Sequence, residues 1–196
     1  ILVAIPLLLF YAFKKYSIQE SLKFIYIPLV VLFLFDFPFL FSDGFLNMVL
    51  FNPKQSLLFD SYYQIGGIKI LLPIASVTMV YFHFFNQKKI NSDLLYFYLG
   101  ILFTVTIFFI YPAPAWYIWL VPFISIYFIQ NNNVSKSYLL HSALSLVYLI
   151  FFLFFYKSEY QDIVFLGNSI DLKIENDKLT NVFFTFLEAV LLAIMY

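Results

Sequence analysis

The sequence contains no cysteine and no arginine, and only 11% of its residues are charged. The absence of cysteine excludes disulfide bonds, thiolate metal sites and cysteine nucleophiles within these residues. A formal net charge of zero argues against nucleic acid as a partner. The sequence also lacks a glycine-rich phosphate loop, a histidine pair at metal-ligand spacing and the serine elbow of hydrolases. We therefore expect no metal and no cofactor, and no motif assigns a catalytic residue.

Apolar residues dominate what remains: they make up 63% of the sequence, and the mean hydropathy is +0.91. This composition leaves too little polar material to cover a soluble globule. Apolar runs near the ~20 residues needed to cross ~30 Å of hydrocarbon recur between short polar patches. The sequence thus predicts an all-α polytopic transmembrane protein of about seven spans. These lie at residues 24 to 42, 67 to 85, 94 to 111, 116 to 130 and 137 to 156, with truncated spans at 1 to 13 and 183 to 196.

Both ends of the sequence run into apolar segments too short to complete a span, and the first residue is Ile1 rather than methionine. We therefore expect residues 1–196 to form a single membrane domain within a longer protein. Lysine and the residues Phe, Tyr, Ile and Asn are abundant, as an AT-rich genome would encode. Part of the aromatic content therefore follows from codon usage.

Lysine placement predicts the orientation of the spans. One set of short loops carries Lys14, Lys15, Lys23, Lys88, Lys89 and Lys136, whereas the longer loops on the opposite side carry an acidic excess. The positive-inside rule places the short lysine-bearing loops in the cytoplasm. We expect an integral protein of a bacterial or archaeal plasma membrane.

Two segments on the predicted outer face differ from the spans. Residues 43 to 66 are half apolar and half polar, which favours a position in the membrane interface. Apolar and polar residues alternate from Ile170 to Glu175, and Gly167-Asn168 can form a tight turn back onto residues 163 to 166. This pattern predicts a small extracytoplasmic β-hairpin, after which Thr180 or Asn181 would cap the last span.

Three ionisable residues within apolar spans are the first candidates for a binding site. Asp36, Lys69 and Glu188 lie at similar predicted depth below the outer face. Charges cost about 2.5 to 3.5 kcal/mol each on insertion scales, so they are functional candidates by default. Pro38 predicts a kink beside Asp36. The functional interpretation is an outward-opening polar vestibule; the structural alternative is a buried ion pair, or side chains that extend to the interface.

A tryptophan pair marks the second candidate site. Trp116, Trp119 and Phe123 are spaced to share one helical face, and prolines at 112, 114 and 122 predict an irregular entry into the membrane. Irregular backbone at that depth is tolerated where it lines a cavity or packs against protein. Flat aromatic rings there suit a sugar ring or an isoprenoid chain, whereas an ordinary aromatic belt is the structural alternative.

The stretch from Pro114 to Phe123 resembles the proline-aromatic-Trp-Pro motif of integral-membrane glycosyltransferases of the GT-C type, such as polyprenol-phosphate-mannose-dependent mannosyltransferases. Trp119 and Pro122 carry the resemblance most strongly. It implies a polyprenyl-phosphate-linked sugar as donor and Tyr117 as a further substrate-binding residue. In that family the catalytic acid usually lies in an outer loop near the N-terminus, which we expect upstream of this sequence.

The functional hypothesis is transfer of a sugar from a lipid-linked donor at the outer face, in envelope polysaccharide or glycolipid assembly. Its substrate-binding residues are Asp36, Lys69, Trp116, Tyr117, Trp119 and Glu188. Two alternatives stay open: a transporter or flippase for a lipid-linked glycan, and a non-catalytic subunit of a membrane complex. Expected partners are membrane lipid and other membrane proteins.

Overall fold

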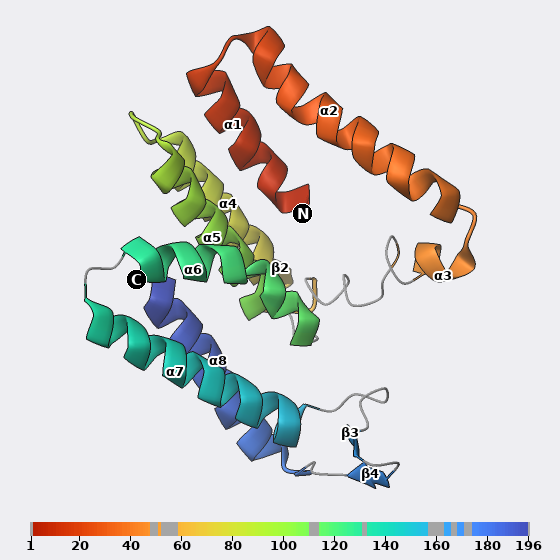
Figure 1. The fold of residues 1–196 in the computed structure, drawn as a ribbon, viewed down its shortest axis with the longest axis vertical. Coiled ribbons are helices and arrows are strands. Elements are labelled where there is room, and N and C mark those ends of the chain that lie inside the picture. The colour runs from red at the N-terminus through yellow and green to blue at the C-terminus, as the bar shows by residue number, and fades with distance from the viewer. Residues whose placement is uncertain are drawn as a thin grey trace. The chain divides into compact units, whose positions relative to one another are not determined.

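The computed structural model describes residues 2–47, 51, 59–109, 114–130, 133–156, 163–165, 168–170 and 174–195. The described elements are mostly helical, with two small antiparallel sheets (Figure 1). The all-α prediction is confirmed in its main part, because helices make up most of the described elements. The chain divides into two compact units, Ile1–Phe123 and Ile124–Tyr196, and the single membrane domain stays a prediction.

The first unit begins with two helices that pack side by side, α1 (Ile5–Lys15) and α2 (Ile18–Asp36) (Figure 1). A capping box starts α2, because Ser17 Oγ accepts a hydrogen bond from the Glu20 N–H while the Glu20 carboxylate accepts one from the Ser17 N–H. A 3₁₀ turn, Phe37–Phe39, and the short helix α3 (Asp43–Phe45) follow α2. The corner between α1 and α2 is therefore fixed by local hydrogen bonds.

A β-hairpin that the sequence interpretation missed precedes the next helix. Strands β1 (Tyr62–Ile65) and β2 (Ile68–Leu71) pair antiparallel, with Ile65 opposite Ile68. Gly66 at the turn has φ +59°, in the left-handed region that glycine adopts without steric cost. Helix α4 (Leu72–Phe85) begins only after β2, so the predicted start of that span at residue 67 is wrong by five residues.

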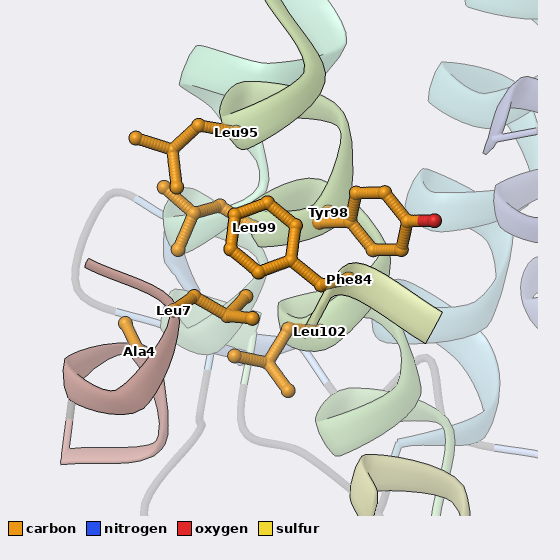
Figure 2. Packing of buried hydrophobic residues seen from close by; sticks show 7 residues of the cluster. All are labelled: Ala4, Leu7, Phe84, Leu95, Tyr98, Leu99 and Leu102. Carbon is orange, nitrogen blue, oxygen red and sulfur yellow. The ribbon is translucent and has the colours of Figure 1, made fainter. Parts of the chain in front are cut away.

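Helices α1, α4 and α5 (Ser92–Phe108) enclose the core of the first unit. Figure 2 shows the Phe84 ring among leucine side chains of α1 and α5. The buried cluster consists of Ala4, Leu7, Phe84, Leu95, Tyr98, Leu99 and Leu102. Tyr81 also donates a hydrogen bond to the Val3 carbonyl, which joins α4 to the start of the chain. Apolar burial thus positions α5 against both helices.

The predicted span at residues 116 to 130 is broken into two pieces. A 3₁₀ helix, η5 (Pro114–Trp119), precedes α6 (Val121–Gln130), and the Leu120 N–H donates to the Tyr117 carbonyl at 3.0 Å. Pro122 lies in the first turn of α6, where its missing N–H removes no helical hydrogen bond. The irregular backbone that Pro114 and Pro122 predict is confirmed.

The second unit is built on two antiparallel helical stretches. Helix α7 (Val134–Ile150) continues into a π-helical turn, Phe151–Phe155, and packs against α8 (Asp177–Met195). The Phe155 and Phe183 rings stack at 4.5 Å between centroids. Asn176 caps α8 by accepting from the Lys178 and Leu179 N–H groups, so the predicted caps at Thr180 or Asn181 are wrong. The helix begins earlier than its apolar run because capping, not hydropathy, sets its first residue.

The predicted C-terminal hairpin is present. Strands β3 (Ile163–Phe165) and β4 (Asn168–Ile170) pair antiparallel with Phe165 opposite Asn168. Asn168 is thus the first residue of a strand, whereas the sequence interpretation placed it in the turn. The predicted continuation of the strand through residues 171 to 173 lies outside the described residues, and its predicted end at Ile174 and Glu175 is not a strand.

Two helical stretches are long and apolar enough to cross a membrane, Ile18–Phe39 and Val134–Phe155. Little of either apolar stretch is buried against protein. Leu72–Phe85, Ser92–Phe108 and Val121–Gln130 are apolar but shorter. These findings on the described residues support association with a membrane, whereas about seven spans stay a prediction.

Candidate functional site

The two tryptophans of η5 form a stacked pair. Trp116 and Trp119 have ring centroids 6.2 Å apart and planes within 3° of parallel. A 3₁₀ helix has three residues per turn, so side chains at i and i+3 lie directly above one another. The predicted shared face is confirmed for the two tryptophans, but 3₁₀ rather than α-helical geometry produces it. Phe123, predicted on the same face, lies on the separate helix α6.

Aromatic contacts hold the pair against α5. The Trp119 and Phe103 rings meet edge to face with centroids 6.1 Å apart, and Phe103 stacks on Phe123 with centroids 5.6 Å apart. Trp119 nevertheless remains 41% exposed. Tyr117, which lies between the two tryptophans in the sequence, is only 7% exposed. Trp119 therefore contacts protein on one side and leaves surface available on another, while Tyr117 serves the packing of η5.

Lys69 does not lie inside a helix as predicted, but on the exposed strand β2. Its Nζ sits 4.1 Å from the centre of the Tyr62 ring on β1. In the hairpin register Lys69 is opposite Gln64, which makes Tyr62 its diagonal neighbour on the same face. The Lys69 ammonium lies over the face of the Tyr62 ring in a β-hairpin. The prediction that Lys69 is buried within a membrane-spanning helix is therefore wrong.

Asp36 is the last residue of α2 and is half-buried. The backbone changes from α to 3₁₀ geometry immediately after it, and Pro38 lies in that 3₁₀ turn. Pro38 has no N–H to continue the α-helical hydrogen bonds, although Phe37 itself keeps α-region dihedrals (φ −50°, ψ −46°). The predicted irregularity beside Asp36 is confirmed. The carboxylate thus lies at the end of a membrane-length stretch.

Glu188 is buried in the second unit, with 3% of its surface exposed. It lies on the α8 stripe that also carries the fully buried Leu187 and Leu191. Ionised carboxylates are expensive to bury without compensating interactions.

The six predicted binding residues are therefore divided between the two units. Asp36, Lys69 and the η5 aromatics belong to the first, and Glu188 belongs to the second. Their convergence on one cavity stays a prediction. Among the described residues, no group of three His, Asp or Glu side chains could hold a metal ion.

Two supporting residues were missed by sequence reasoning. Phe103 lies within a uniformly apolar run, where nothing distinguishes the ring that contacts Trp119 from its neighbours. Tyr62 had a usable signal, because Gly66-Gly67 between short β-branched and aromatic runs is typical of a hairpin. That hairpin would have placed Tyr62 and Lys69 on one face.

Comparison with protein-family models, curated proteins and solved structures gives no match to this chain.

Proposed function

We propose that the chain belongs to an integral-membrane glycosyltransferase that transfers a sugar from a polyprenyl-phosphate donor at the outer membrane face. The product would be an envelope polysaccharide or glycolipid. The observation that carries the proposal is the parallel Trp116–Trp119 pair on a proline-bounded 3₁₀ segment. Small-molecule sites are lined mainly by apolar and aromatic groups with few polar ones, and this segment supplies the aromatic part.

The geometry of η5 supports a role in binding. The contact with Phe103 fixes the Trp119 ring, while its 41% exposure leaves indole surface for a sugar ring or an isoprenoid chain. A rigid aromatic group loses little conformational entropy when a ligand packs against it. The pair therefore suits recognition better than a mobile surface tryptophan would.

Charged groups complete the proposed chemistry. A carboxylate at the outer face acts as general base: it takes the proton of an acceptor hydroxyl as that oxygen bonds to the anomeric carbon. Asp36 contributes to substrate binding. The bond from the anomeric carbon to the phosphate oxygen breaks, and its electron pair leaves with the lipid phosphate. Lys69 stabilises the negative charge of the departing phosphate. Its exposed position on the hairpin supports contact with a head group.

The proposed topology has about seven spans, with the lysine-bearing short loops in the cytoplasm. Lys15 is one of the lysines on which this orientation depends; its Nζ donates to Tyr11 Oη at 2.8 Å, and this hydrogen bond raises the pKa of Lys15. The ammonium at the α1–α2 corner therefore remains charged at neutral pH.

Sugar transfer in proteoliposomes tests the proposal. Purified full-length protein is supplied with a radiolabelled polyprenyl-phosphate sugar, and lipid- or glycan-linked label is measured. Asp36→Asn keeps the side-chain shape but removes the charge, so we expect reduced transfer while membrane expression stays largely intact. Lys69→Gln should raise KM more than it lowers kcat. Transfer unchanged in both variants would reject these roles.

The transporter alternative is favoured by one observation, the burial of Glu188. Buried carboxylates in membrane helices commonly serve coupling or passage of ions. If Glu188→Gln abolishes movement of a lipid-linked glycan between leaflets and no transfer is detected, the transporter function replaces the enzyme. If neither activity is found in protein that folds, the chain is a non-catalytic subunit.

A further inference from the structure

The second unit contains a pocket that the proposed chemistry does not use. Its volume is about 350 Å³, and it lies between the end of α6 and the first turns of α7. The walls are formed by Phe128, Ile129, Val134, Ser137, Tyr138 and His141. This volume is at the lower end of the range for small-molecule sites.

Polar groups of Ser137, Tyr138 and His141 interrupt the apolar lining of this pocket. Ser137 is 8% exposed, and its hydroxyl has no hydrogen-bond partner among the described residues. His141 follows four residues later, on the same face of α7. The His141 and Phe128 rings are perpendicular, with centroids 5.4 Å apart and an angle of 89° between their planes. This contact holds the imidazole at the wall of the pocket. Because an unpaired buried hydroxyl costs free energy, Ser137 favours a ligand with hydrogen-bonding capacity.

The charge around the pocket favours an anion. Neither α6 nor α7 carries an acidic side chain, and Lys136 is their only permanently charged residue. The pocket lies at the first turn of α7, whose unpaired N–H groups and dipole give this end partial positive charge. Asn133 caps the turn by accepting from the Lys136 N–H at 3.0 Å. A negatively charged group is therefore better accommodated here than a cation.

The mouth of the pocket favours a lipid over a soluble anion. Ile129 is 82% exposed and Val134 is 62% exposed, and both line the same pocket as the buried hydroxyl. Val134 is also the first residue of the membrane-length stretch Val134–Phe155. An apolar rim around polar donors matches a molecule with a charged head and a hydrocarbon tail.

We propose that this pocket binds the phosphate head group of an anionic membrane lipid. The Ser137 hydroxyl and an N–H of His141 donate hydrogen bonds to phosphate oxygens, while the acyl chain packs along Ile129 and Val134. This site is additional to the proposed sugar-transfer site and depends only on insertion in a membrane.

Native mass spectrometry of the full-length protein in detergent tests the site. The protein is titrated with phosphatidylglycerol and, separately, with phosphatidylcholine, and the apparent Kd of the first bound lipid is measured. We expect phosphatidylglycerol to bind at least tenfold more tightly. Equal affinity for the two lipids would overturn the proposal. Millimolar inorganic phosphate should not displace phosphatidylglycerol; displacement would show a soluble-phosphate site instead.

Three variants assign the binding to this pocket. Ser137→Ala should weaken phosphatidylglycerol binding about tenfold, since hydrogen bonds to charged groups are among the stronger ones. It should not lower the thermal stability of lipid-free protein, because it removes an unpaired hydroxyl. His141→Gln, an exposed change, should weaken binding about threefold. Ser142→Ala, also exposed on α7, is the matched control and should bind normally. Unchanged affinity in both pocket variants would overturn the assignment.

Discussion

At the scale of single residues, the contact between Trp119 and Phe103 distinguishes a positioned aromatic group from a simple membrane anchor. The spacing of the tryptophans was sufficient to predict their shared face. It could not identify Phe103, because ring-to-ring contacts between helices depend on packing angles that hydropathy does not encode. Similarly, hydropathy could not identify the contact between Lys69 and Tyr62, because that contact depends on strand register.

Phe103→Leu should loosen Trp119 without unfolding the protein. The change removes an edge-to-face contact worth about 0.5–1.5 kcal/mol while keeping an apolar side chain. Residues 1–196 contain only two tryptophans, Trp116 and Trp119. Their fluorescence therefore reports directly on the environment of this pair, provided any other tryptophans in the full-length protein are replaced. We expect a red shift and easier quenching by acrylamide. Phe97→Leu, an exposed change on the same helix, should leave the spectrum unaltered; an equal shift would contradict the positioning role.

The interaction between Tyr62 and Lys69 should be measurable as a coupling energy. A double-mutant cycle with Tyr62→Leu and Lys69→Gln should give about 0.5–1 kcal/mol in chemical unfolding, the range of exposed cation–π pairs. Tyr62→Phe should retain most of it, because the ring face remains. Tyr63 alternates to the other side of β1 and is exposed. A cycle that replaces Tyr63 instead should show no coupling, and equal coupling there would refute the specific contact.

At the scale of secondary-structure elements, apolar runs predicted helices well and their ends poorly. Each predicted span in the first unit overlaps a helix, yet α4 starts at Leu72 because a hairpin occupies the residues before it. In the same way, α8 starts at Asp177 because Asn176 caps it. Caps and turns depend on one or two residues, which a hydropathy window averages away. The predicted C-terminal hairpin is present, but β4 includes only Ile170 of the alternating run, so the ends of this element were also predicted poorly.

Gly66→Ala should weaken the β1–β2 hairpin. Its φ of +59° costs a residue with a Cβ about 1–2 kcal/mol, although no atom within 4 Å obstructs the added carbon. Gly67→Ala is the matched control, since its Cβ is equally unobstructed and its φ is not in the left-handed region. Hydrogen exchange of the strand amides should accelerate about tenfold in the first variant only. The same exchange in both variants would mean that turn conformation does not limit hairpin stability.

At the scale of the whole molecule, composition was sufficient to predict a mostly helical chain with membrane-length segments. Two such helices are present among the described residues. Composition could not show how the elements group, so the division into two units was not foreseen. Grouping depends on which apolar faces meet. Helices that are apolar on all sides carry little pattern that distinguishes a protein-facing side from a lipid-facing side.

Cysteine accessibility in intact cells tests the proposed membrane topology most directly. The chain has no cysteine of its own, so single cysteines are introduced into full-length protein from which any others have been removed. Gly67→Cys and Ser169→Cys lie on the two hairpins, and Ser135→Cys lies in the first turn of α7. We expect an impermeant maleimide to label the two hairpin cysteines in intact cells and Ser135→Cys only after permeabilisation. Labelling of Ser135→Cys in intact cells, with both hairpin cysteines protected, would contradict the topology.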